Sequence, residues 1–210
     1  MNRRWLLRIS AFLIVIGLPL VFFLYWKHRL DQAPREADQI PVLWPMPEFR
    51  SPYSERDSLS NQDLRGSVVV IDFIFTNCGS ICPQLSMTMR QIQESFRNDD
   101  RVVLVSFTID PLRDTFPVLR QYAARYGAIS GKWFFLRPDT STLRFLTNEG
   151  FKVPVVHTPE AGYGYEFTHT NRLVLVDAMG QIRGFYDGLD KQSIDQLYDD
   201  IGRLLIQMRS

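Results

Sequence analysis

The sequence has few cysteines, two in 210 residues, and no clear excess of either sign of charge. Two cysteines are too few for a small fold held together by disulfides. The 24 Lys and Arg against 23 Asp and Glu leave a formal net charge of +1, which excludes nucleic-acid binding through a general positive charge. Twelve glycines and twelve prolines exclude a collagen-like chain. Hydrophobic residues at 45% and charged residues at 22% are typical of a folded globular protein.

One long hydrophobic run is present, near the amino terminus. Residues 9–26 carry no charged side chain, and a helix over them would be about 27 Å long, close to the thickness of a bilayer's hydrocarbon core. Aromatic residues lie where the membrane interfaces would be, at Trp5, Tyr25 and Trp26. The alternative is a cleaved signal peptide, but no Ala-x-Ala-like cleavage site follows the run. We therefore expect one uncleaved transmembrane helix.

This run divides the chain into four expected parts. Residues 1–8 would form a cytoplasmic N-terminus, 9–26 the anchor, 27–54 a proline-rich stem and 55–210 a single folded domain. Arginines before the run give a weak positive-inside bias. We therefore expect a single-pass protein of the inner (cytoplasmic) membrane with its domain on the periplasmic or equivalent outer side. That compartment permits disulfides, which bears on the two cysteines.

Strand and helix patterns alternate through residues 55–210. Apolar, β-branched and aromatic runs predict buried strands at 68–75 and 101–109. Further strands are predicted at 133–136, 173–176 and 182–186, the last two joined by a tight turn. Helices are predicted at 83–96, 115–126, 141–149 and 193–208. This order indicates an α/β domain with a mixed sheet flanked by helices.

Cys78 and Cys82 lie directly after the first of these strands, where the next helix begins. The free backbone N–H groups and the helix dipole at such a position favour negative charge, so a thiolate there is stabilised and its pKa lowered. A spacing of four residues can place both sulfurs on one helix face, near enough for a disulfide or for one metal ion. The alternative is a structural disulfide, but so short a loop removes little entropy from the unfolded chain.

Three segments resemble the Sco/SenC family, membrane-anchored copper proteins that help to assemble the copper centre of cytochrome c oxidase. The segments are FTNCGSICP, SFTIDPLRDT and FTHTNRLVLVDAMGQIRGFYDG. They occur in the family's order, and the resemblance covers the anchor and essentially the whole domain. It implies a thioredoxin-like fold with copper ligands at Cys78, Cys82 and His169. Gly79 and Thr168 depart from the proline and aspartate that many members have there, but neither departure removes a ligand.

The residue types agree with a copper site. Two thiolates and one imidazole form a soft ligand set that suits Cu(I) and also accepts Cu(II). Structural zinc normally takes four protein ligands, and none of the candidates for a fourth (His157, Met87 and Met89) is expected to be a primary ligand. His169 alone would be interpreted as a structural histidine, and the cysteine pair favours its role as a ligand. Asp110 follows the second strand, at the sheet edge where α/β proteins place their sites; an auxiliary role and a plain turn role are both open.

Three functions are considered. The first is a copper chaperone, whose partners by resemblance are the copper-bearing subunit of cytochrome c oxidase and other copper chaperones. The second is a thiol-disulfide oxidoreductase acting on partner cysteines, which a low-pKa thiolate favours; related reductases, however, have a C-x-x-C spacing and a cis-proline before the facing strand. The third is a peroxidase of the peroxiredoxin type, which is disfavoured because its Thr-x-x-Cys element is absent around Cys78. We do not expect a conventional enzyme, although thiol-disulfide exchange stays open.

Overall fold

A computed structural model describes residues 17–32, 40–153, 157–158, 166–167 and 171–208. The chain divides into two compact units, Met1–Gln39 and Ile40–Ser210. In the first unit the structure describes α2 (Leu18–Gln32). Within the described ranges, no helix has both the length and the apolar character needed to cross a membrane. Residues 9–16 of the anchor expected at 9–26 lie outside these ranges.

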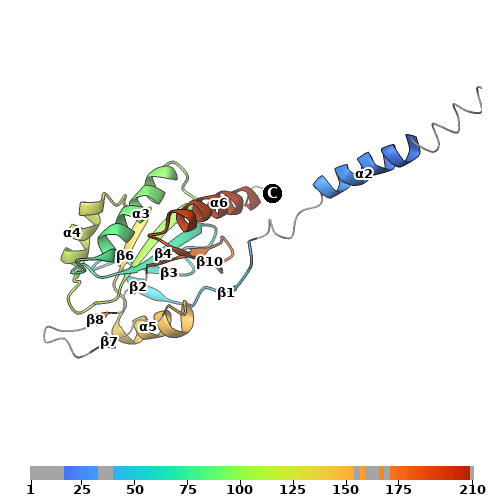
Figure 1. Cartoon of the computed structure of the whole chain (residues 1–210). Helices are drawn as coiled ribbons and strands as arrows, with labels where there is room; N and C mark the ends of the chain where they lie inside the picture. The colour runs from blue at the N-terminus through green and yellow to red at the C-terminus, as the bar shows by residue number, and fades with distance from the viewer. Residues whose placement is uncertain (1–16, 33–39, 154–156, 159–165, 168–170, 209–210) are drawn as a thin grey trace, which may run out of the picture. The chain divides into compact units, whose positions relative to one another are not determined.

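The second unit is built on a six-stranded sheet with the order β1-β10-β9-β4-β5-β6 (Figure 1). Its central strands, β4 (Val68–Ile74) and β5 (Val102–Thr108), are parallel and buried along their whole length. Such apolar, β-branched runs fit strands that are covered on both faces. β6 (Trp133–Leu136) continues the parallel part beside β5, and β9 (Arg172–Val176) pairs with β4 in the antiparallel direction. The sheet is therefore mixed, as predicted.

The other half of the sheet is a hairpin with a short edge strand. β10 (Gln181–Asp187) returns antiparallel to β9, and β1 (Trp44–Pro45) pairs with β10 at the edge. The Asp177 carboxylate fixes the turn, because it accepts the backbone N–H groups of residues 179 and 181 at 2.9 Å each. Gly180 completes the turn with a φ of 72°, a conformation that glycine adopts without strain.

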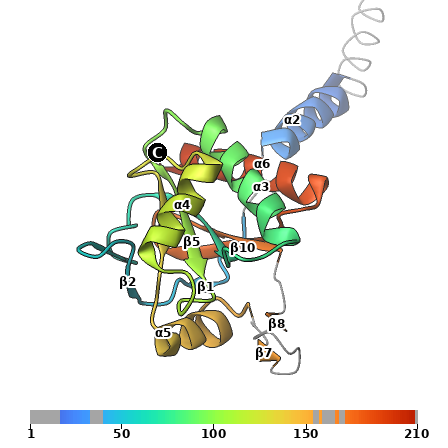
Figure 2. The same cartoon turned by 90° about the vertical axis from the view of Figure 1, so that its left-hand side faces the viewer.

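Helices cover both faces of the sheet. α3 (Ile81–Ser95), α4 (Phe116–Tyr126) and α6 (Lys191–Gln207) lie on one face, as Figures 1 and 2 show. α5 (Thr140–Phe145) and the π-helical turn η3 (Leu146–Gly150) lie on the other. Alternate side chains of the central strands enter two separate apolar clusters, one under each layer of helices. The result is a three-layer α/β unit with a buried sheet.

Two small sheets stand beside the main one. β2 (Arg50–Pro52) pairs with β3 (Ser58–Ser60), and β7 (His157–Thr158) pairs with β8 (Glu166–Phe167), both in antiparallel fashion. The sequence patterns did not predict these short pairs. By contrast, every strand and helix predicted within residues 55–210 is present with ends within two residues, the helix at 141–149 being divided between α5 and η3.

Residues 40–54 belong to the folded unit, although the sequence placed them in a proline-rich stem. Met46 and Phe49 are buried in the same apolar cluster as strand β4, which explains why this segment packs rather than extends. Pro45 is tolerated because β1 is an edge strand. Arg183 holds the start of the unit by donating to the carbonyls of Ile40 and Pro41. The unit therefore begins at Ile40 rather than at residue 55.

Candidate functional site

Cys78 lies in the loop between β4 and α3, one turn before the helix. Its backbone N–H donates to the carbonyl of Phe75 at 3.2 Å, which closes a tight turn after the strand. Its sulfur accepts the backbone N–H of Cys82 at 3.4 Å and lies 3.7 Å from the Ser80 hydroxyl. The first N–H groups of a helix have no partner within the helix. The Cys78 sulfur therefore satisfies one of them, in the place that a capping side chain would take.

Cys82 occupies the first turn of α3 and points into the protein. It is 3% exposed, compared with 7% for Cys78, and belongs to the apolar cluster under α3, α4 and α6. Both residues are thiols in this structure. The two sulfurs do not share a helix face as expected, because Cys78 precedes the helix; its sulfur instead turns back onto the first turn and accepts the Cys82 N–H.

The two thiols have opposite pKa shifts. Burial would raise the pKa of the Cys78 thiol, but hydrogen bonds from the Cys82 side chain and backbone, and from Ser80, together lower it. Burial raises the pKa of Cys82, and its hydrogen bond to the Cys78 sulfur raises it further. Cys78 is flanked by the exposed residues Asn77 and Gly79. The arrangement thus offers one activated sulfur near the surface and one protonated sulfur behind it.

Asp114 holds the strand end that leads into Cys78. Its carboxylate accepts the backbone N–H of Thr76 at 3.1 Å and the Thr76 hydroxyl at 2.5 Å. It also accepts the hydroxyl of Thr108, at the end of the neighbouring strand β5, at 2.5 Å. The side chain is buried, and this burial raises the pKa of Asp114 against the effect of its hydrogen bonds. Sequence reasoning overlooked this residue, although the DPLRDT motif contains it.

Asp110, the predicted auxiliary residue, takes part in the turn after β5. Its carbonyl accepts the backbone N–H groups of Arg113 and Asp114, and its own N–H donates to the Thr108 hydroxyl. Its carboxylate lies 3.5 Å from the Arg113 guanidinium. These contacts give it a role in shaping the turn that presents Asp114.

Asp72 is a second buried carboxylate, on β4 beneath the cysteine loop. One oxygen accepts the Ser106 hydroxyl at 2.5 Å, and the Ser106 oxygen in turn accepts the Trp133 indole N–H at 2.9 Å. The other oxygen has no hydrogen-bond partner among the described residues. Complete burial raises the pKa of Asp72 to about 7, and its charge contributes to the raised pKa of Cys82.

The histidines expected near the cysteines are not placed by the structure. His169 lies outside the described residues, and of His157 only the backbone, paired with Phe167 across β7 and β8, is described. Within the ranges that are described, no group of three or more His, Cys, Asp or Glu side chains is arranged to hold a metal ion. Met89 is completely buried and Met87 is exposed on the same helix. The three-ligand set expected from the sequence therefore stays a prediction.

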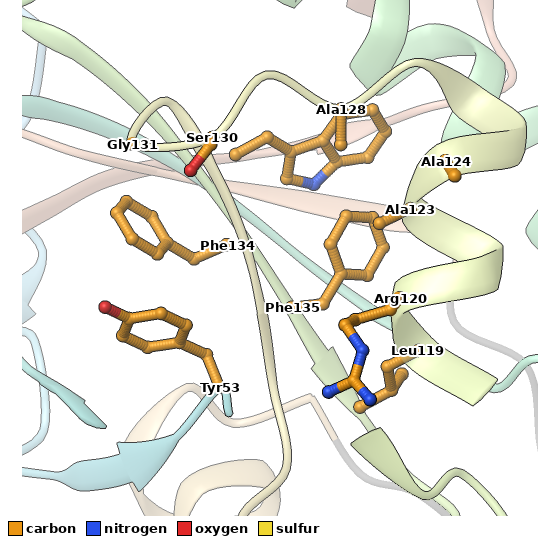
Figure 3. Close-up of a pocket in the computed structure, with 11 residues that line it drawn as sticks. Tyr53, Leu119, Arg120, Ala123, Ala124, Ala128, Ser130, Gly131, Phe134 and Phe135 are labelled. Atoms are coloured by element: carbon orange, nitrogen blue, oxygen red, sulfur yellow. The ribbon is translucent and has the colours of Figure 1, made fainter. Parts of the chain in front are cut away.

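A cavity of about 370 Å³ lies elsewhere, beside the edge strand β6 and helix α4 (Figure 3). Tyr53 and Phe134 lie against each other on one side of it, and Phe135 lies toward α4 on the other. Arg120 at its rim pairs with Glu55 at 2.8 Å. Neither cysteine lines this cavity, so we treat it as separate from the dithiol.

A mixed sheet with helices on both faces, and a cysteine pair where the helix after the first central strand begins, defines a thioredoxin-like protein. Solved structures agree. BsSco, described as a member of the Sco family of cytochrome c oxidase assembly proteins, matches with a TM-score of 0.68 at 27% identity over 79% of this chain and 96% of its own. Copper-bound ScoI of Bradyrhizobium japonicum shares the fold with a TM-score of 0.65 at 19% identity, over 76% of this chain and 99% of its own.

The family follows from the sequence match. The SCO1/SenC family model matches residues 46–205, and the chain belongs to this family. A relative named SCO1 protein homolog, from Bacillus subtilis, is 28% identical over 163 residues, which cover 77% of this chain and 83% of the relative. A SCO1/SenC family lipoprotein of Bacillus anthracis matches in structure with a TM-score of 0.71 at 23% identity, over 82% of this chain and 99% of its own. The match begins within the segment that the structure adds to the folded unit.

Proposed function

We propose that this protein is a copper-binding assembly factor for the copper centre of cytochrome c oxidase. Its family membership supports the proposal, as does the description of its relative BsSco as a cytochrome c oxidase assembly protein. The observation that carries it is the pair of thiols Cys78 and Cys82, held within hydrogen-bonding reach of each other at the start of α3. Two such sulfurs are the donors that copper prefers.

The ligands we propose are Cys78, Cys82 and His169. The lowered pKa of Cys78 favours the thiolate that a metal requires. Cys82 has a raised pKa, so it must give up its proton when a metal binds, and copper uptake is expected to release protons. The imidazole of His169 would complete a soft set that accepts Cu(I) and Cu(II).

We also propose that residues 9–26 anchor the protein in the inner membrane, with the folded unit on the periplasmic or equivalent outer side. The uncharged run and its flanking aromatic residues support this. A relative from Bacillus anthracis is described as a lipoprotein. Membrane fractionation tests the proposal: the full chain should resist extraction by alkaline carbonate, and removal of residues 1–26 should release it. Full extraction of the intact chain would refute the anchor.

A second function, thiol-disulfide exchange with partner cysteines, is favoured by the asymmetry of the two thiols. Exchange proceeds by attack of a thiolate on a disulfide sulfur, followed by resolution by a second thiol. A Cys78 of lowered pKa, in a loop between exposed residues, suits the attack, and a protonated Cys82 behind it suits the resolution. The relative BsSco is described as having a disulfide switch. Reduction of the oxidase subunit's cysteines would prepare them to receive copper, so the two functions are compatible.

Copper stoichiometry tests the ligand set. The full chain in detergent should retain about one copper per chain after dialysis, because two thiolates and an imidazole suit this metal. Cys78→Ser, Cys82→Ser and His169→Ala should each lose it. His157→Ala is the matched control and should retain copper. Full occupancy in His169→Ala would refute the three-ligand form of the proposal, and full occupancy in both cysteine variants would refute the site.

A further inference from the structure

The loop that carries Cys78 is connected to a buried carboxylate that is not one of the proposed ligands. Asp114 is 1% exposed. Within the described part of the chain its carboxylate accepts hydrogen bonds from Thr76, two residues after the end of β4, and from Thr108, the last residue of β5. Thr76 is two residues before Cys78. The carboxylate therefore joins two strand ends directly beneath the loop that presents the activated sulfur.

The network around this carboxylate leaves it little freedom. The backbone N–H of Asp114 donates to the Asp110 carbonyl at 2.9 Å, and the Asp110 N–H donates to the Thr108 hydroxyl at 3.1 Å. No Lys or Arg pairs with the Asp114 carboxylate in the described part of the chain. A buried carboxylate without a cation depends on its hydrogen bonds, since an unsatisfied polar group in the interior is costly. Thr76 is thus held in one position.

We propose that Asp114 is a positioning residue for Cys78, and that by holding Thr76 it stabilises the reduced form of the Cys78–Cys82 pair. The inference rests on the proposed function only in that it takes Cys78 and Cys82 as the reactive pair of the site. The connection runs through the chain: Asp114 holds Thr76, and Thr76 lies inside the turn that the hydrogen bond from Cys78 to Phe75 closes. The Cys78 sulfur then meets the N–H of Cys82.

The effect on the redox state follows from the hydrogen bonds that the Cys78 sulfur accepts. In the dithiol it accepts the Cys82 N–H, and it lies within hydrogen-bond range of the Ser80 hydroxyl. A thiolate is a much stronger acceptor than a disulfide sulfur, because bonds to an ionised acceptor are about twice as strong as neutral ones. These bonds therefore favour the reduced form. A loosened Thr76 lets the sulfur move away from them, and oxidation to the disulfide becomes easier.

The test is the equilibrium of the metal-free full chain, in detergent, with glutathione. One oxidised glutathione takes two electrons and the two thiol protons from Cys78 and Cys82, giving the protein disulfide and two reduced glutathione molecules. In Asp114→Asn, we expect the equilibrium constant to shift about tenfold toward the disulfide, a fall of about 30 mV in potential. Thr76→Val keeps the backbone N–H and the Asp114 charge, so we expect a smaller shift in the same direction.

The matched control is Asp200→Asn, another buried carboxylate, which accepts the Tyr186 hydroxyl at 2.7 Å on the α6 side. It should leave the potential unchanged. If Asp114 acted through its charge, its neutralisation would stabilise the thiolate and raise the potential instead. A rise in Asp114→Asn, or an unchanged Thr76→Val, would overturn the inference; if Asp114→Asn fails to fold, Thr76→Val decides alone. Because no copper is used, failure of copper binding does not affect this result.

Discussion

Cys78 and Cys82 are the same residue type four positions apart, yet their surroundings move their pKa values in opposite directions. Cys78 receives hydrogen bonds at the start of a helix, whereas Cys82 is buried behind it and adjoins the Cys78 sulfur. An asymmetric pair of this kind suits both capture of a soft metal and attack on a disulfide. At this scale, the chemistry of the site comes from two hydrogen-bond environments rather than from the cysteines alone.

Asp72 gives a pH-dependent prediction. Its pKa is raised to about 7 by burial, so the native state keeps a proton that the unfolded chain releases near pH 4. The stability that the native state gains by keeping Asp72 protonated is fully present below about pH 4, and it is lost as the pH rises through 7. Relative to Asp72→Asn, the wild type should lose roughly 3 kcal/mol of unfolding free energy between pH 5 and pH 8, at 1.36 kcal/mol per pKa unit.

Urea unfolding of both proteins across this pH range measures the difference. Each protein has the same remaining titratable groups, so their common pH dependence cancels in the comparison. Parallel stability curves for wild type and Asp72→Asn would show that Asp72 has an ordinary pKa in the folded state.

Strand β1 and the segment after it are held against the π-helical turn η3. The Trp44 indole N–H donates to the carbonyl of Gly150 at 3.0 Å, and the Pro47 ring lies over the same glycine. A Cβ at position 150 would come within 2.7 Å of Pro47 Cγ. The close approach therefore requires glycine, and it ties residues 40–54 to the face of the sheet opposite α3.

Gly150→Ala should consequently lower the unfolding free energy by about 1–3 kcal/mol, the usual cost of overpacking. Gly202→Ala is the matched control: Gly202 lies in α6 with nothing within 4 Å of the added Cβ. It should raise stability by about 0.5–1 kcal/mol through helix propensity. Thermal unfolding of both variants measures these effects. Equal stability of Gly150→Ala and the wild type would show that Pro47 does not pack as described.

The elements that the sequence predicted well are those with a strong periodic pattern. β4 and β5 are continuous apolar runs, and α6 has a regular apolar face. The local sequence of each element therefore predicts both its type and its buried side. β1 is two residues long and lies among prolines, and its pairing with β10 depends on a strand far along the chain. Local sequence carries no signal for such a pair.

The candidate site follows the same division between local patterns, which the sequence shows, and long-range contacts, which it does not. The position of Cys78 and Cys82 after a strand, at the start of the next helix, follows from local patterns and is confirmed. The link between Thr76 and Asp114 required knowing that β4 and β5 are neighbours with aligned ends. The DPLRDT motif was noted, but sequence alone drew attention to Asp110 rather than to Asp114, the residue that contacts the cysteine loop.

At the scale of the whole molecule, the folded unit spans Ile40–Ser210, and the proposed anchor lies before it. A fragment that starts at residue 55 lacks β1 and β2 and removes Met46 and Phe49 from the core. Each fully buried side chain of this kind contributes about 1.5–3 kcal/mol. We therefore expect fragment 55–210 to be several kcal/mol less stable than fragment 40–210, or not to fold.

Circular dichroism during urea unfolding compares the two fragments. Fragment 40–210 should show a cooperative transition at the higher midpoint. Identical midpoints and slopes would contradict the placement of residues 40–54 in the folded unit and would restore the stem that the sequence suggested.

The central claim is that Cys78 and Cys82 together bind copper, and the most direct measurement is the absorption spectrum of the reduced full chain as Cu(II) is added in detergent. The account predicts an intense thiolate-to-copper band that saturates near about one equivalent, since both sulfurs are expected to be ligands. The band should disappear in Cys82→Ser and persist in Met87→Leu, a change at an exposed position on the same helix. An absent band in the wild type, or an unchanged band in Cys82→Ser, would contradict the account.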